Sequence, residues 1–217
     1  MLQTLVAYNK HVSNNQNLYI SALKSKTPIV VVTGPAGSGK TFYACKEAVS
    51  HMINGSIDNL IITRPTKTVD ENHGYLPGDI NKKLAPWVRP IHDSIDKSIP
   101  DKKAREKFRK KVEIAPLAYM RGRTFDNSWI IADEMQNATA NQTKMMLTRI
   151  GYNSKLILTG DINQSDILND GLSDLINRMQ VYSQPLEFIS HVELTGEDIV
   201  RHEAIKEILD MYLETSN

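Results

Sequence analysis

The segment Gly34–Thr41 constrains the fold of this chain more than any other stretch of its sequence. It reads Gly-Pro-Ala-Gly-Ser-Gly-Lys-Thr and closely follows the apolar run Ile29–Val32. A buried strand that ends in closely spaced glycines can wrap its backbone N–H groups around an anion, because glycine tolerates the sharp turn and the close approach. A helix that begins at such a loop adds unpaired N–H groups and about half a positive charge. The segment therefore predicts a phosphate-binding loop between a strand and a helix.

Two side chains at the end of this loop have predicted chemical roles. The ammonium group of Lys40 is expected to reach the β- and γ-phosphates, and the hydroxyl group of Thr41 is expected to bind Mg²⁺. The predicted ligand is a nucleoside triphosphate. The residues expected to surround its phosphates and base at the loop are Gly34, Pro35, Ala36, Gly37, Ser38, Gly39, Lys40, Thr41 and Phe42.

The composition is that of an ordinary globular protein. With 217 residues, 41% of them hydrophobic, the chain is long enough for one core and short for two nucleotide-binding domains, so we expect one domain over residues 1–217. The 26 Lys and Arg nearly balance the 25 Asp and Glu, so any attraction to nucleic acid must be local. No export signal or membrane-spanning run is apparent, and the single cysteine, Cys45, is expected to be buried. These features favour a cytoplasmic protein.

Short apolar strands alternate with helical patterns along the chain. Helices are predicted at about Lys40–Ile53, from Thr139 to a stop at Gly151, and at about Asp198–Glu214. This alternation predicts an α/β fold with a mostly parallel sheet, helices on both faces, and ligands at the carboxyl ends of the strands. The predicted strands are Ile29–Thr33, Leu60–Thr63, Val112–Ala115, Trp129–Ala132, Leu156–Thr159 and Phe188–Leu194.

The stretch 76–111 departs from this alternation and is interpreted as a basic, proline-rich insertion. Its last ten residues contain seven bases, and the spacing of Ala104 and Phe108 predicts a short helix with one small apolar stripe. A solvated helix face is the simpler interpretation. Contact with the phosphate backbone of a nucleic acid is the alternative, because this is the one obvious basic cluster in a nearly neutral chain. The residues assigned to that contact are Lys102, Lys103, Arg105 and Lys107.

A second strand ends in groups suited to nucleotide hydrolysis. Asp133 and Glu134 directly follow the apolar strand that ends at Ala132. An aspartate at a strand end beside the glycine loop can hold Mg²⁺, and an adjacent glutamate can polarise the attacking water. The amide of Gln136 can bridge the γ-phosphate and that water, whereas a polar surface position is the alternative.

A third strand ends at Thr159 and continues with Gly160, Asp161 and Gln164. In a parallel sheet its carboxyl end would lie beside that of the strand before Asp133, so Thr159, Asp161 and Gln164 could line the same cleft. Turn formation at Gly160 and Asp161 is the competing structural explanation.

With these motifs the chain resembles the PhoH-like proteins, relatives of the superfamily-one helicase motor domain, over about residues 16–212. The resemblance extends well beyond the phosphate loop. The matching stretches are Gln16-x-x-Tyr19, Thr63-Arg64-Pro65, Gly74-Tyr75-Leu76-Pro77-Gly78-Asp79, Arg89-Pro90-x-x-Asp93, residues 115–124, Asp133-Glu134-x-Gln136-Asn137, residues 147–151, Thr159-Gly160-Asp161-x-x-Gln164 and residues 198–202.

The resemblance implies a Mg²⁺-dependent ATPase with a three-layer RecA-like core, assembled into rings such as hexamers, in a bacterium or a phage-infected bacterial host. By that analogy, Gln16 would contact adenine, Gln136 would sense the γ-phosphate, and Arg201 would stabilise developing charge on the ATP of an adjacent subunit. An ion pair with Glu197 or Asp198 is the structural alternative for Arg201. The other arginines in matching motifs are Arg64, Arg121, Arg123 and Arg149.

Two functions remain open on the sequence. The first is a nucleic-acid-coupled, helicase-like ATPase acting on RNA or single-stranded DNA, which the Asp133-Glu134-x-Gln136 motif and the basic segment favour. The second is a nucleotide-dependent switch or assembly factor that acts on a protein partner, which the overall charge balance favours. A small-molecule kinase is less expected, because kinases of this fold usually lack the adjacent glutamate that activates water.

Overall fold

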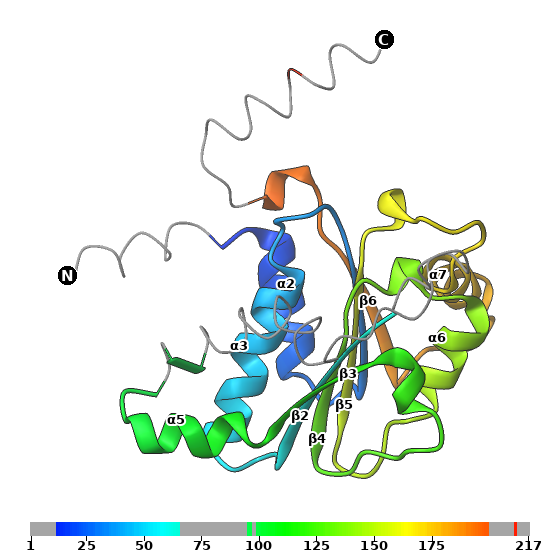
Figure 1. Cartoon of the computed structure of the whole chain (residues 1–217). Coiled ribbons are helices and arrows are strands. Elements are labelled where there is room, and N and C mark those ends of the chain that lie inside the picture. The colour runs from blue at the N-terminus through cyan, green and yellow to red at the C-terminus, as the bar shows by residue number, and fades with distance from the viewer. Residues whose placement is uncertain (1–11, 66–94, 97–98, 200–210, 212–217) are drawn as a thin grey trace, which may run out of the picture.

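The computed structural model describes residues 12–65, 95–96, 99–199 and 211, which are built around one six-stranded sheet. All its strands are parallel, and their order is β3-β2-β4-β5-β1-β6 (Figure 1). The six predicted strands are confirmed, each within one residue at either end. They are β1 (Ile29–Thr33), β2 (Asn59–Arg64), β3 (Val112–Pro116), β4 (Ser128–Ala132), β5 (Lys155–Gly160) and β6 (Ile189–Glu193).

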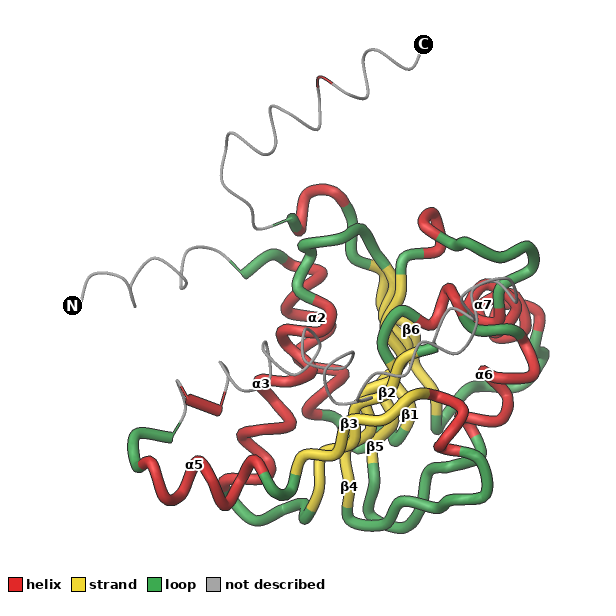
Figure 2. The backbone as a smooth tube through the Cα atoms, in the orientation of Figure 1, coloured by secondary structure: helices red, strands yellow, loops and turns green. Residues whose placement is uncertain are grey.

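Helices cover both faces of the sheet (Figure 2). On one face lie α2 (Asn14–Lys24), α3 (Lys40–Ile53) and α5 (Lys102–Arg109), and on the other lie α6 (Ala140–Leu147) and α7 (Gly171–Val181). This arrangement confirms the predicted fold class, a three-layer α/β P-loop NTPase of RecA-like type. Within the described ranges, no helix has both the length and the apolar character needed to cross a bilayer.

The alternation of side chains along each strand divides the core into two clusters. In β1, Val30 and Val32 pack toward α2 and α3, whereas Val31 packs toward α6 and α7. Every residue of β4 and of β5 is buried, as expected for central strands covered on both faces. Burial of each large aliphatic side chain stabilises the fold by about 1.5–3 kcal/mol.

The predicted starts of two helices are confirmed, and one predicted end is wrong. α3 spans the predicted residues, and α6 begins after a capping box in which Thr139 and Gln142 exchange hydrogen bonds. However, α6 ends at Leu147 rather than at Gly151. Gly151 serves a different purpose, since a Cβ atom there would overlap a carboxylate oxygen of Asp126. Close approach of two loops, rather than a helix stop, explains this glycine.

Two described helices were not predicted. α2 begins with a capping box between Ser13 and Gln16, and α7 begins with Asp170 accepting hydrogen bonds from the backbone of Leu172 and Ser173. Of the predicted helix at Asp198–Glu214, residues 200–210 and 212–217 lie outside the described residues, while Asp198 itself ends the 3-10 helix η5 (Gly196–Asp198). The insertion is described at residues 95–96 and 99–111, where α5 confirms the predicted short helix.

The single cysteine is buried, as predicted. Cys45 lies in α3 with 2% of its surface exposed. Burial raises the pKa of its thiol to about 12, and Asp133 acts in the same direction. The thiol therefore stays protonated and serves as a small apolar group in the core.

Candidate nucleotide site

The loop Gly34–Thr41 joins the carboxyl end of β1 to the first turn of α3, as predicted. Gly34, Gly37 and Gly39 have φ angles of 147°, 85° and 97°, in the region that favours glycine. A Cβ atom at Gly34 would overlap the carbonyl oxygen of Leu194, so a side chain cannot fit there. These conformations turn the chain tightly between strand and helix, which is the geometry required of a phosphate-binding loop.

Lys40 folds back over this loop. Its Nζ donates hydrogen bonds to the carbonyl oxygens of Gly34, at 2.5 Å, and Pro35, at 2.9 Å. Burial lowers the pKa of Lys40, while the carboxylates of Asp161, Glu134 and Asp133 act in the opposite direction. A cationic side chain that satisfies its donors with loop carbonyls can exchange them for phosphate oxygens without leaving the loop.

Three separate segments meet at Asp133. Its Oδ1 accepts hydrogen bonds from the hydroxyl group of Thr41, at 2.9 Å, and from the hydroxyl group of Thr159. The side chain of Asp133 is buried, at the carboxyl end of β4 between β2 and β5. The structure therefore brings together the loop after β1 and the ends of β4 and β5, as the parallel sheet predicts.

Gln136 links the two acidic ends of β4 and β5. Its Nε2 donates to a carboxylate oxygen of Glu134 at 2.7 Å, and its Oε1 accepts from the backbone N–H of Asp161 at 3.1 Å. Gln136 is 2% exposed, so the alternative of a polar surface residue is wrong. Gly160 is required beside it, because a Cβ atom at Gly160 would lie 2.7 Å from the Gln136 Oε1.

The loop after β5 both lines the cleft and forms a turn, the two interpretations that the sequence left open. Asp161 is buried beside Gln136, and it also forms a turn in which its Oδ1 accepts from the backbone N–H of Asn163. Gln164 is exposed, and its backbone N–H donates to the Asp161 carbonyl. Turn formation and lining of the cleft are therefore compatible at this segment.

The remaining predicted contacts of the nucleotide lie along the loop and its helix. Ala36 and Gly37 are exposed, and the Ser38 hydroxyl donates to the carbonyl of Pro35. Phe42 is 47% exposed and packs edge-on against Tyr43, with ring centres 5.2 Å apart. Phe42 thus offers an accessible aromatic surface beside the loop.

Gln16 is buried behind the phosphate loop rather than open to it. Its Nε2 donates to the carbonyl oxygens of Ser38, at 3.1 Å, and Asp198, at 2.8 Å. Its Oε1 accepts from the backbone of Ser13 and from the Tyr43 hydroxyl. All four hydrogen-bonding positions of this amide are occupied, so contact with adenine requires the exchange of one of these partners. The role of Gln16 at the base stays a prediction.

Asp198, in the 3-10 helix η5, connects the segment after β6 to the start of α2. The residues around Asp198 in the sequence did not indicate this role. Its carboxylate accepts hydrogen bonds from the side chains of Ser13 and Asn15 and from the backbone of Thr195. Burial alone raises the pKa of the Asp198 carboxyl, but these hydrogen bonds outweigh burial and lower it. Arg201, the predicted charge-stabilising arginine, lies three positions further, outside the described residues.

Thr41 and Asp133 fit the expected magnesium ion. Their side-chain oxygens lie 2.9 Å apart at the base of the phosphate loop. Among the described residues, no group of three or more His, Cys, Asp or Glu side chains could form a metal cage. Mg²⁺ is commonly bound by one or two protein oxygens together with the phosphates of a nucleotide, and this donor set meets that requirement.

Arg64 is the arginine that the structure places at the acidic pair. Its Nε and Nη2 donate to the Asp133 Oδ2 at 3.0 and 2.6 Å, and Nη2 lies 3.4 Å from the Glu134 Oε1. The sequence motifs place Arg64 among several candidate arginines and favour Arg201 over it. No sequence signal linked Arg64 to Asp133, because the two are 69 positions apart.

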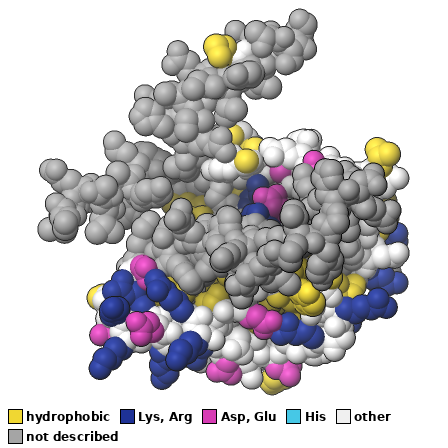
Figure 3. All heavy atoms as spheres, in the orientation of Figure 1, with side chains coloured by type: hydrophobic (Ala, Val, Ile, Leu, Met, Phe, Trp, Pro, Cys, Tyr) yellow, Lys and Arg dark blue, Asp and Glu magenta, His cyan; other side chains and the backbone are white. Residues whose placement is uncertain are grey.

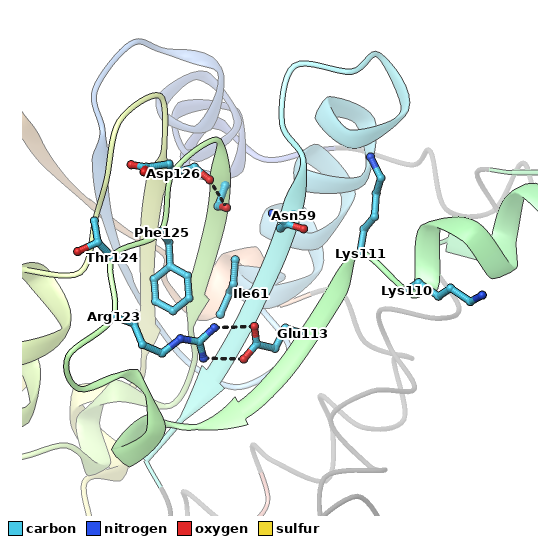
Figure 4. Close-up of a pocket in the computed structure, with 10 residues that line it drawn as sticks. Asn59, Ile61, Lys110, Lys111, Glu113, Arg123, Thr124, Phe125 and Asp126 are labelled. Carbon is cyan, nitrogen blue, oxygen red and sulfur yellow. Dashed lines mark hydrogen bonds and ion pairs between the residues drawn. The ribbon is translucent and has the colours of Figure 1, made fainter.

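Two other candidate arginines have structural partners away from the loop. Arg123 forms a two-pronged ion pair with Glu113, at 2.6 and 2.7 Å, and lies over the ring of Phe125 (Figure 4). This pair borders a cavity of about 280 Å³ that also contacts the amino ends of β2 and β4. Arg149 donates to the carbonyl oxygens of Met145 and Arg123. Both side chains therefore hold loops together.

The basic helix α5 lies at the amino end of β3, whereas the phosphate loop lies at the carboxyl end of β1 (Figure 1). Ala104 and Phe108 pack against the core as predicted. Arg105 and Arg109 face the carboxylate of Asp96, at 3.9 and 2.7 Å. Dark blue side chains gather over α5 in Figure 3, and the exposed bases among the predicted contacts are Lys102, Lys103 and Lys107.

Comparison with known proteins gives relatives over most of the chain. A family model described as PhoH-like protein matches residues 10–213. The chain is 42% identical over 203 residues to a PhoH-like protein of Synechocystis, covering 93% of this chain and 61% of that protein. It is 41% identical over 200 residues to protein PhoH of Escherichia coli, covering 89% and 55%. Since it spans only 55–61% of these relatives, the expectation of one domain over residues 1–217 stays a prediction.

Solved structures give more distant matches. The Hef helicase domain of Pyrococcus furiosus aligns over 84% of this chain and 39% of its own, with 14% identity and a TM-score of 0.48. A structure of Pif1 helicases, described as the basis of DNA unwinding at forked double-stranded DNA, aligns over 93% and 48%, with 14% identity and a TM-score of 0.45.

Proposed function

This chain belongs to the PhoH-like protein family, and we propose on that basis and on the geometry of its site that it is a Mg²⁺-dependent ATPase. The observation that carries the proposal is the convergence on Asp133 of the Thr41 and Thr159 hydroxyl groups, directly beneath the glycine loop. A polar turn at the end of a strand does not by itself require two hydroxyl groups from other segments to meet on one carboxylate beside a phosphate-binding loop.

In the proposed reaction, each side chain has a separate task. Lys40 leaves the carbonyls of Gly34 and Pro35 and binds the β- and γ-phosphate oxygens. Thr41 and Asp133 hold Mg²⁺, which when bound supplies positive charge to the phosphate oxygens. Glu134 accepts a proton from the attacking water or polarises it. The amide of Gln136, which donates to the Glu134 carboxylate, bridges that water and the γ-phosphate. The products are ADP and inorganic phosphate.

We propose further that nucleic acid stimulates this activity. The basic helix α5 supports this step, since its exposed lysines can neutralise phosphates of RNA or single-stranded DNA. The decisive assay measures ATP turnover with and without each nucleic acid at two salt concentrations. Stimulation at low salt that fades at high salt is expected. The absence of any stimulation would favour the alternative function, a nucleotide-dependent switch or assembly factor that acts on a protein partner.

We propose, from the family resemblance, that Arg201 acts on the ATP of an adjacent subunit in a ring. An arginine in that role typically accelerates hydrolysis by about 10³- to 10⁵-fold. Arg201→Ala should then bind ATP and hydrolyse it slowly. Mixing it with Lys40→Ala subunits should restore part of the activity, since their Arg201 can serve a neighbour. If the two variants co-assemble and ATP hydrolysis is not restored, Arg201 acts within its own subunit or has no role in hydrolysis.

A further inference from the structure

The ends of β2 and β4 are fixed against each other beside the acidic pair. Thr63 lies opposite Ala132 in the parallel register, and the backbone N–H of Asp133 donates to the Thr63 carbonyl at 2.9 Å. This contact places Arg64, the last residue of β2, next to the two carboxylates that directly follow β4. The position of Arg64 is thus set by the sheet itself rather than by a loop.

The two carboxylate oxygens of Asp133 have different partners. Oδ1 faces the hydroxyl groups of Thr41 and Thr159, which is the side of the phosphate loop. Oδ2 accepts two N–H groups of the Arg64 guanidinium. A guanidinium that holds one oxygen through two donors fixes the rotation of the carboxylate, and this leaves the other oxygen directed at the loop.

Glu134 is held from two sides. Its backbone adopts a left-handed conformation with φ of 56°, which is uncommon for a residue with a side chain. Its Oε2 accepts from Gln136, and its Oε1 lies within ion-pair distance of Arg64. Because the Glu134 side chain is 45% exposed, little else among its described contacts restricts its rotamer.

We propose that Arg64 is a positioning residue that keeps the carboxylates of Asp133 and Glu134 in their working orientation. It neutralises part of the repulsion between two adjacent anions and ties both to the end of β2. The inference rests on the proposed ATPase function, and it adds a group whose effect is on the rate of hydrolysis rather than on the affinity for ATP. Lysine cannot fully replace Arg64, because its single ammonium group lacks the planar arrangement of donors.

Steady-state kinetics of Arg64→Gln and Arg64→Lys test this proposal. Hydrogen-bond partners that orient a metal-binding side chain, as Arg64 orients Asp133, typically contribute about 10- to 100-fold to metal affinity or activity. We therefore expect kcat to fall by about that factor in Arg64→Gln, with partial retention in Arg64→Lys. The affinity for a fluorescent, non-hydrolysable ATP analogue, measured without Mg²⁺, should stay within about threefold of wild type, since Arg64 acts through the carboxylates and not on the nucleotide.

The matched control is Arg123→Gln, which breaks the equally close arginine–carboxylate pair between Arg123 and Glu113 (Figure 4). It should leave kcat unchanged. Combining Arg64→Gln with Glu134→Gln should add little to the loss caused by Glu134→Gln alone, because the two residues act together. If Arg64→Gln does not fold, Arg64→Lys with the same kcat as wild type overturns the proposal.

Two failures can be told apart. No phosphate release from ATP by the wild-type chain contradicts the ATPase function itself. Wild-type turnover with unchanged kcat in Arg64→Gln contradicts only the positioning role. A parallel loss of analogue binding in Arg64→Gln, with kcat unchanged, would assign Arg64 to direct binding of the nucleotide instead and also overturn the proposal.

Discussion

Two lysines at opposite ends of the sheet, Lys40 partly buried and Lys155 buried, make a natural comparison. Lys40 donates to the carbonyls of Gly34 and Pro35 at the carboxyl end of β1, and Lys155 donates to the carbonyls of Ala22 and Ser25 at the amino end of β5. Burial lowers the pKa of both, to about 8 for Lys155. Each ammonium group thus donates to two backbone carbonyls, and burial lowers the pKa of each.

Their surroundings differ in charge. Three carboxylates, those of Asp161, Glu134 and Asp133, act on Lys40. Lys155 instead donates hydrogen bonds to the carbonyls of Ala22 and Ser25 at the carboxyl end of α2. Its ammonium group also lies 5.7 Å from the centre of the Trp129 ring. A cation at a helix carboxyl terminus stabilises the helix, whereas a cation facing converging carboxylates beside a glycine loop is suited to a phosphate ligand. The neighbouring charges therefore distinguish a binding lysine from a structural one.

The largest expected effect separates the two lysines directly. Lys40→Ala should weaken ATP binding roughly 10²- to 10⁴-fold, since charge-assisted hydrogen bonds contribute about 1.5–3 kcal/mol each and two are removed. Turnover should disappear with it. Fluorescence titration with a labelled ATP analogue measures the affinity. Lys155→Met is the control, and near-normal binding is expected for it. An equal loss of ATP affinity in both variants would show that the neighbouring charges do not distinguish the two lysines.

A second prediction uses the lowered pKa of Lys155. The unfolded chain holds this proton up to about pH 10.4, whereas the folded chain releases it at about pH 8. Between these values the unfolded state binds more protons, so the free energy of unfolding should rise with pH by up to about 1.4 kcal/mol per pH unit. Urea unfolding at pH 7.5, 8.5 and 9.5 measures it. Lys155→Met should lack this part of the rise, and an identical slope in both proteins would argue against a depressed pKa.

The smallest expected effect concerns basic side chains that lie far from the loop. Replacing Lys102, Lys103, Arg105 and Lys107 together by Ala should leave ATP binding unchanged. If these residues contact single-stranded nucleic acid, the slope of log affinity against log salt should flatten by about 0.7 for each phosphate that is no longer neutralised. Filter binding at several salt concentrations gives the slope. An unchanged slope would return α5 to the simpler interpretation, a solvated helix face.

Local sequence signals predicted the parts of this structure that depend on neighbours in the chain. The glycine loop, the apolar strands and the capping box at Thr139 all use residues within a few positions of one another. α2 carries the same kind of capping box at Ser13 and could have been found by that signal. By contrast, the pairing of Arg64 with Asp133 and of Asp198 with Ser13 spans 69 and 185 positions. The register of the sheet decides the first contact and the packing of η5 against the start of α2 decides the second, and no local pattern encodes either.

The burial of Lys155 could not be predicted from the sequence either. Lys155 is the first residue of β5 and, read locally, looks like a solvated strand end. It is buried because α2, 130 positions away, ends over it and offers carbonyl acceptors. The phosphate loop could be predicted because its chemistry lies within eight consecutive residues, whereas Lys155 needed the tertiary structure.

Glu134→Gln gives the most direct test of the central claim, that the carboxyl end of this sheet hydrolyses ATP. The measurement quantifies bound ATP and released phosphate in the same sample, with wild type beside it. The substitution keeps the shape of the side chain and removes the charge that polarises water, so phosphate release should fall by about 10²- to 10⁴-fold while ATP stays bound and intact. Phosphate release at the wild-type rate in Glu134→Gln would contradict this claim.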